Sequence, residues 1–252
     1  MTLIAGFRFN DGVLLCSDSQ MESVTIKTKE PKICMTKFPG GHAAFTFAGN
    51  ARKAQSTIYA CVKRLRTRKP HEDVFVLLEQ VIEIYYRKLV HKDPDYGKDH
   101  NLHYDLILAV WIEERKRVFI WSTQDVSLYE STVDYICAGV GLDLGYYMVS
   151  PIFSSEMNER ETLFLAIYMM ARVSDNAQGI GGMSHYLAMH NDGTASPVME
   201  VELNEALKYK VKGWDASAAN FLIFSALQEV DEARRFQLLR QVDMVHRDAS
   251  LF

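Results

Sequence analysis

The first fifty residues constrain the fold most, because short apolar runs alternate there with turn residues. Residues 2–9 and 13–18 are apolar runs that flank the sequence Asn-Asp-Gly at residues 10–12, which is typical of a tight turn between antiparallel strands. Residues 42–48 form a continuous apolar run, which predicts a strand covered on both faces. The chain is therefore expected to bury sheets between other layers.

The residues after position 50 alternate between helical and strand patterns. Apolar side chains recur every three or four residues over 51–66 and 71–90, which predicts two amphipathic helices. Similar patterns predict further elements, with helices over 158–173 and 215–244 and strands near 32–37, 104–112, 116–123, 133–138, 183–190 and 207–212. This order predicts an α+β fold, a four-layer α-β-β-α sandwich of two mostly antiparallel sheets.

Size and composition limit the class of protein. At 252 residues, of which 48% are apolar, the chain can bury a substantial core, and we expect one domain over residues 1–252 with a helical extension from about 215 to 252. The net charge of −4 argues against a nucleic-acid partner. The four cysteines form no CxxC pair, and neither a leader nor a bilayer-spanning apolar run is evident. We therefore expect a cytoplasmic protein without a membrane partner.

Thr2 is the first candidate for chemistry. If Met1 is removed, Thr2 carries a hydroxyl and an α-amine in one residue, and a small residue after Met favours that removal. An α-amine has an ordinary pKa of roughly 7.7–8.0, so a useful fraction is unprotonated at neutral pH. The hydroxyl and the amine together form the nucleophile and base of an N-terminal threonine.

The loop from His91 to His103 contains histidines and aspartates but lacks the spacing of a metal site. His100 and His103 have no third ligand nearby in the sequence, and the aspartates before them are not followed by the glutamate of a calcium loop. We expect neither a metal nor another cofactor.

The segment from Thr2 to Ser19 resembles the start of a proteasome β-type subunit, in the N-terminal nucleophile (Ntn) hydrolase superfamily, whose bacterial proteasome-like branch is included in the resemblance. Lys32-Ile33 and the segment from Phe47 to Ala51 follow in the order of that family. The resemblance implies a threonine-type peptidase or amidohydrolase. It also implies that Thr2 is the nucleophile, Asp18 and Lys32 are its charged partners, and the backbone N–H of Gly49 forms the oxyanion hole.

The same resemblance assigns residues around this centre. Ser174 and Asp175 match a supporting Asp–Ser pair, although with a shift of about two residues against the following Gly-Gly. Met21, Cys34 and Phe47 match the lining of an apolar substrate pocket. Val140 departs from the family, which commonly has a serine there that bonds the terminal amine.

Members of the family usually assemble into rings or helical stacks, so the resemblance implies a homo-oligomer that acts on peptide or protein substrates. It leaves an ATPase partner open. Two alternatives remain: an Ntn hydrolase of small amides, and a catalytically inactive proteasome-like scaffold.

Overall fold

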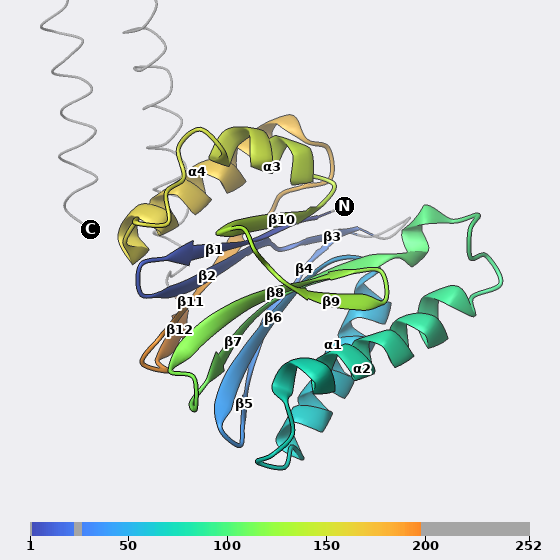
Figure 1. The fold of residues 1–252 in the computed structure, drawn as a ribbon. Helices are drawn as coiled ribbons and strands as arrows, with labels where there is room; N and C mark the ends of the chain where they lie inside the picture. Colours follow the sequence, from blue (N-terminus) through green and yellow to red (C-terminus); the bar gives the residue numbers. More distant parts are fainter. Residues whose placement is uncertain (1, 23–26, 198–252) are drawn as a thin grey trace, which may run out of the picture. The chain divides into compact units, whose positions relative to one another are not determined.

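The computed structural model describes residues 2–22 and 27–197, which fall within one compact unit, residues 1–199 (Figure 1). The expected strand near 207–212, the helix over 215–244 and the C-terminal extension lie outside the described residues. Within the described part of the chain, no helix is long and apolar enough to cross a membrane.

The first sheet has five antiparallel strands, and the strand nearest the N-terminus lies inside it rather than at an edge. In spatial order the strands are β10 (Tyr135–Gly139), β1 (Leu3–Phe9), β2 (Gly12–Asp18), β11 (Ser184–His190) and β12 (Ala195–Pro197). The pairing of Phe9 with Gly12 closes the turn expected at residues 10–12.

The second sheet is also antiparallel, and its strands follow one another in sequence order. They are β5 (Ile33–Phe38), β6 (Gly41–Gly49), β7 (Tyr104–Ile112), β8 (Arg117–Gln124) and β9 (Ser127–Glu130). A small separate hairpin, β3 (Gln20–Glu22) and β4 (Lys27–Lys29), lies in sequence between the two sheets.

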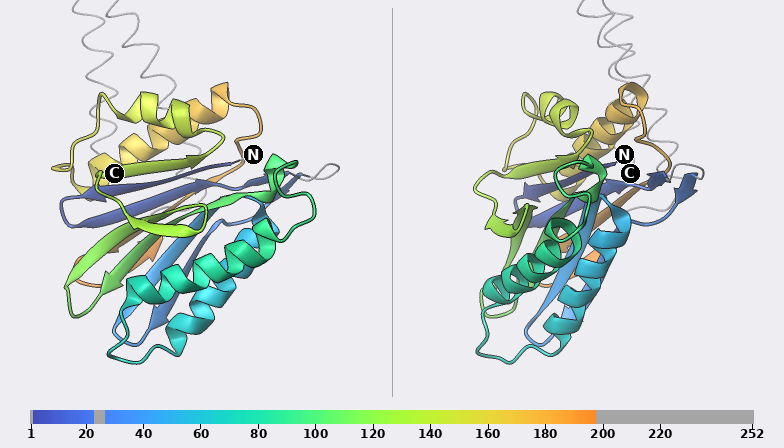
Figure 2. Two further views of the ribbon diagram at one scale, coloured as in Figure 1. Left: turned by 45° about the vertical axis from the view of Figure 1, so that its right-hand side comes forward. Right: turned by 90° about the vertical axis from the view of Figure 1, so that its right-hand side faces the viewer.

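Helices cover the outer face of each sheet, as Figures 1 and 2 show. α1 (Ala51–Arg66) and α2 (Val74–Tyr86) pack against the second sheet, whereas α3 (Leu142–Val149) and α4 (Glu159–Asn176) pack against the first. Side chains from both sheets meet in the middle layer, where Ile4 and Val13 share a buried cluster with Ile107. This is the expected four-layer α-β-β-α sandwich.

Burial explains why the strands have their sequences. Every residue of β2 is buried, and so are most residues of β6, because helices cover one face of each sheet and the other sheet covers the opposite face. Gly6 in β1 leaves room for this contact: a Cβ there would lie 2.6 Å from Cδ1 of Ile120 across the middle layer.

Several boundaries differ from the sequence-based expectation. The helix expected over 71–90 begins after the N-cap Asp73 and ends at Tyr86, where the π-helical turn η1 (Arg87–His91) follows. The hairpin β3–β4 is not among the strands expected from the sequence. β9, β12, α3 and the single 3₁₀ turn η2 (His100–Leu102) were not expected at all. All of the unexpected elements are at most eight residues long, too short for a clear periodic pattern.

Candidate active site

Thr2 directly precedes β1 and is buried, with 6% of its surface exposed. The strand that follows is paired on both sides, since Leu3 lies opposite Gly139 of β10 and Ile4 lies opposite Ser17 of β2. Gly139 has φ +94°, and a Cβ there would lie 2.2 Å from the backbone oxygen of Thr2. Glycine is therefore required where β10 passes the threonine.

Lys32 reaches Thr2 from the other sheet, at the residue before β5. Its ammonium donates to Oγ1 of Thr2 at 2.8 Å, to Oδ1 of Asp18 at 2.9 Å and to the backbone oxygen of Gln20 at 2.5 Å. An ammonium has three donors, and all three are used here. The Thr2 hydroxyl therefore accepts a hydrogen bond from a fixed positive charge.

Asp18 ends β2 and connects three segments of the chain. Its Oδ1 accepts the backbone N–H of Leu3 at 3.2 Å, and its Oδ2 accepts that of Gln20 at 3.2 Å. The backbone of Gly181, in the glycine-rich turn before β11, is near enough to lower the pKa of this carboxyl. The carboxylate that holds the lysine is thus fixed by backbone groups.

Burial dominates the electrostatics of the site. Asp18 and Lys32 are each 2% exposed. Burial raises the pKa of the Asp18 carboxyl, and the Lys32 charge opposes that shift. Burial lowers the pKa of the Lys32 ammonium, and Asp18 opposes that shift in turn. The lysine therefore releases a proton more readily than a solvated lysine does, while the ion pair favours the charged form.

Gly49 lies at the end of β6 with φ +83°. A Cβ there would lie 2.5 Å from the backbone oxygen of His103 and 2.9 Å from Cα of Tyr104, so no larger residue fits without movement. The same end of β6 adjoins Thr2, because a Cβ on Gly139 would lie 3.0 Å from Cβ of Ala48 as well as close to the Thr2 oxygen.

The other residues assigned from the resemblance lie in different surroundings. The Ser174 hydroxyl donates to the backbone oxygen of Ala171 in its own helix, α4, and Asp175 follows it in the last turn. Phe47 is buried in the core between the second sheet and helices α1 and α2. Cys34 is exposed on β5, and Met21 is in β3 with a side chain outside the described part of the structure. The described bonds thus join Thr2, Asp18 and Lys32 to one another, and those of Ser174 lie within α4.

Sequence reasoning missed the backbone contributors. Gln20 receives one Lys32 proton on its carbonyl oxygen and donates its own N–H to Asp18. His185 on β11 lies close enough for Asp18 and Lys32 to influence it electrostatically, although burial is the main cause that lowers the pKa of its imidazole. Backbone N–H and carbonyl groups occur in every residue, so the sequence does not show which of them contribute to the site. Only the glycines of residues 179–182 indicated a backbone contribution.

Two antiparallel sheets between helix layers, with a threonine at the start of an internal strand, define the proteasome-like fold of the Ntn hydrolases. No family model matches this sequence, and no curated protein matches it either. Solved structures do match, and several of them are structures of the ancestral β-subunit, Anbu.

The chain superposes on Anbu from Yersinia bercovieri with a TM-score of 0.70 and 14% identity, over 91% of this chain and 98% of that chain. It superposes on the Anbu complex of Pseudomonas aeruginosa, solved as a helical assembly, with a TM-score of 0.73 and 14% identity, over 92% and 99%. For Anbu from Hyphomicrobium sp. strain MC1 the TM-score is 0.66 at 14% identity, over 91% and 98%. The proteasome-like fold is therefore shown, as the sequence motifs predicted.

Proposed function

We propose that this protein is a threonine-type hydrolase of peptide or amide bonds, with Thr2 as its nucleophile once Met1 has been removed. One observation carries the proposal: the Lys32 ammonium bonds both Oγ1 of Thr2, at 2.8 Å, and the Asp18 carboxylate, at 2.9 Å, in a buried site. A fixed ammonium beside a hydroxyl stabilises the negative charge that develops on the oxygen, while the α-amine of the same residue can serve as the base.

In the first step Oγ1 of Thr2 forms a bond to the carbonyl carbon of the substrate, and the hydroxyl proton passes to the free α-amine of Thr2. The Lys32 ammonium stabilises the negative charge that develops on Oγ1. The C–N bond then breaks, and the leaving amine takes up the proton, which leaves an ester on Thr2. In the second step the α-amine removes a proton from water, and the resulting hydroxide attacks the carbonyl carbon of the ester. The C–O bond to Oγ1 then breaks, the acyl group leaves as a carboxylic acid, and the proton on the α-amine returns to Oγ1 of Thr2.

Gly49 is the proposed oxyanion donor. It ends β6 beside the segment that adjoins Thr2, and its lack of a side chain permits close approach of a substrate carbonyl. Removal of one such donor typically lowers turnover by about 10²–10³-fold. Asp18 is proposed to hold Lys32 in place through the bonds described above.

The test begins with the intact mass of the purified protein. Loss of Met1, followed by a stoichiometric β-lactone or epoxyketone adduct on Thr2, is the expected result. Thr2→Ala should abolish the adduct, whereas Thr2→Ser keeps a hydroxyl and should retain slower labelling. A protein that has lost Met1 but remains unlabelled would contradict the proposal.

A second candidate is a catalytically inactive proteasome-like scaffold. The observation that favours it is Val140, which is 62% exposed next to Gly139, where a serine of the family would bond the terminal amine. In that case Met1 stays on all molecules. If Thr2 is active instead, a panel of peptides and small acyl amides distinguishes the peptidase from a small-amide hydrolase.

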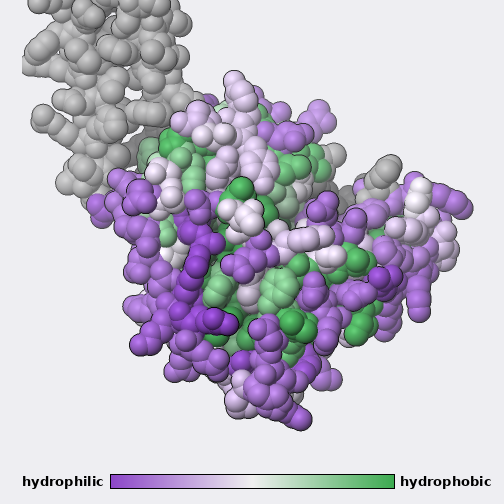
Figure 3. All heavy atoms as spheres, viewed as in Figure 1, coloured by the Kyte–Doolittle hydropathy of each residue, from purple (hydrophilic) through white to green (hydrophobic). Residues whose placement is uncertain are grey.

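We further propose that the chain forms a homo-oligomer. Anbu from Pseudomonas aeruginosa was solved as a helical assembly, and this chain shares its fold. Hydrophilic residues predominate on the face shown in Figure 3, with apolar residues in patches among them. Light scattering after size exclusion tests the assembly. An ATPase partner is a separate question: hydrolysis of peptides without degradation of folded proteins would indicate a need for an unfolding ATPase.

A further inference from the structure

The turn at Gly49 and Asn50 is held by the loop that precedes β7. The backbone N–H of Asn50 donates to the carbonyl of His103 at 2.9 Å, and its side-chain amide donates to the carbonyl of Asn101 at 3.0 Å. Its side-chain oxygen accepts the N–H of Lys53 and so caps α1. The position of Gly49 therefore depends on where His103 and its neighbours lie.

His103 is fixed in turn by a short chain of hydrogen bonds. The Tyr86 hydroxyl lies 2.7 Å from Nδ1 of His103 and 3.0 Å from Oδ1 of Asp125, to which it donates. A tyrosine hydroxyl has one proton, and here that proton is used on the carboxylate. Nδ1 of His103 must therefore carry a hydrogen and donate it to the tyrosine oxygen.

The side chains in this hydrogen-bonded series come from three separate segments of the fold. Tyr86 is the last residue of α2, 1% exposed, and the π-helical turn η1 begins directly after it. Asp125 is at the turn between β8 and β9 with φ +52°, a conformation that aspartate tolerates better than most residues. π-Helical turns are often found at functional sites, and here one begins beside the tyrosine.

The backbone carbonyl of His103 connects these hydrogen bonds to Gly49, the proposed oxyanion donor. The backbone oxygen of His103 accepts the N–H of Asn50, and it is also the atom nearest to the place where a Cβ of Gly49 would be. A shift of His103 therefore moves or loosens the turn that contains Gly49. Displacement of a reacting group by about 1 Å can lower turnover by about 100-fold.

We infer that Asp125, Tyr86 and His103 are positioning residues that hold the Gly49–Asn50 turn in place for the reaction at Thr2. The inference rests on the proposed function for its effect on turnover. Its structural part, that the network fixes the turn, does not depend on any activity.

The experiment compares Tyr86→Phe with Tyr85→Phe in the full-length protein. Both variants lose one hydroxyl from α2, but only Tyr86 is bonded to His103. For Tyr86→Phe we expect kcat to fall between about 10-fold and 100-fold with KM nearly unchanged, because the oxyanion donor acts in the transition state. Hydrogen exchange at the Asn50 amide should also accelerate, whereas Tyr85→Phe should match the wild type in both measurements.

A second pair of variants keeps the test decisive if Tyr86→Phe fails to fold. His103→Asn places an amide N–H near the position of Nδ1 and should recover most of the turnover that His103→Ala loses. Equal kcat values in this pair, or a change in KM alone, would overturn the inference. If Thr2→Ala leaves hydrolysis intact, the proposed function fails, and the Asn50 exchange rate still decides whether the network holds the turn.

Discussion

Two lysine–aspartate ion pairs in this protein have nearly the same length and very different surroundings. Lys32 and Asp18 are 2.9 Å apart with side chains 1% and 2% exposed, whereas Lys53 and Asp93 are 2.8 Å apart with side chains 14% and 24% exposed. Burial raises the pKa of Asp18, but the hydrogen bond from Lys53 lowers the pKa of Asp93. The distance between the charges is thus a poor guide to their chemistry, because access to water decides the direction of the shift.

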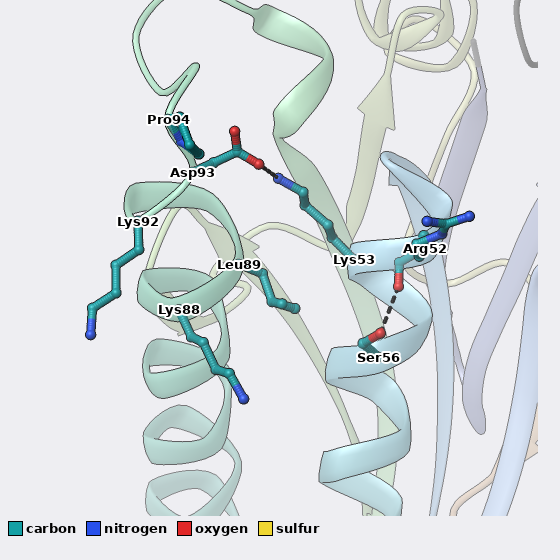
Figure 4. A pocket seen from close by; sticks show the side chains of 8 residues that line it. All are labelled: Arg52, Lys53, Ser56, Lys88, Leu89, Lys92, Asp93 and Pro94. Carbon is teal, nitrogen blue, oxygen red and sulfur yellow. Dashed lines mark hydrogen bonds and ion pairs between the residues drawn. The ribbon is translucent and has the colours of Figure 1, made fainter.

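The second pair lies in an open pocket between α1 and the π-helical turn η1 with the residues that follow it (Figure 4). Lys53 and Asp93 bridge the two sides of this pocket, and the figure shows Lys92 extending away from them. Four basic residues and one acidic residue are among the eight that line the pocket, which are Arg52, Lys53, Ser56, Lys88, Leu89, Lys92, Asp93 and Pro94. Solvent screens these charges, so the pair acts as a weak tether, whereas the buried pair is suited to chemistry.

The largest effect is expected for Lys32→Met. This change removes the charged donor to Oγ1 of Thr2, so turnover and labelling of Thr2 should fall by about 10²–10³-fold. Asp93→Asn breaks the exposed pair instead and should leave both rates as in the wild type. Rates of covalent labelling measured by mass spectrometry check the two variants together, and equal losses in both would refute the contrast.

Stability should show the next largest difference. Lys32→Met leaves the Asp18 carboxylate buried without its partner, which typically costs about 3–5 kcal/mol of unfolding free energy. Adding Asp18→Asn to Lys32→Met removes that charge and should restore much of the loss. Urea unfolding of the single and double variants measures this, and a double variant as unstable as Lys32→Met would argue against a buried charge as the cause.

The pH dependence of labelling should reveal the lowered pKa of Lys32. As the pH rises through that pKa, the ammonium loses a proton and Thr2 loses its donor, so the rate should decline at a pH below the roughly 10.4 of an ordinary lysine. Asp18→Asn removes the charge that opposes the shift and should move the decline to lower pH. A decline at the same pH in Asp18→Asn and the wild type would contradict the coupling between the two groups.

The smallest effect is expected at the exposed pair. Lys53→Met should reduce the unfolding free energy only slightly, because solvent screens this ion pair. The difference from the wild type should shrink as salt is added, since screening weakens the pair in the wild type. Thermal unfolding at low and high ionic strength measures this. A loss comparable to that of Lys32→Met would mean that the two environments differ less than their exposure indicates.

The sequence was sufficient for the layers of the fold and for the identity of the charged centre, for different reasons. Apolar periodicity defined β2, β6 and α1 because each of these elements must bury a face. Lys32 stands among several lysines of a polar stretch, and only the order of family motifs singled it out. The backbone bonds of Gln20 to Asp18 and Lys32 escaped prediction, because main-chain groups can be assigned a role only when distant segments come together. The hairpin β3–β4 was not predicted because a strand of three residues is too short to show an alternating apolar pattern.

Chain ends are usually the least ordered part of a protein, yet β1 is paired with a neighbour on each side from its first residue, Leu3. If Thr2 is the nucleophile, as proposed, this pairing presents it to each substrate in one orientation. A segment fused directly ahead of Thr2 would then occupy the place of its free α-amine. We therefore expect an affinity tag at that position to abolish covalent labelling of Thr2.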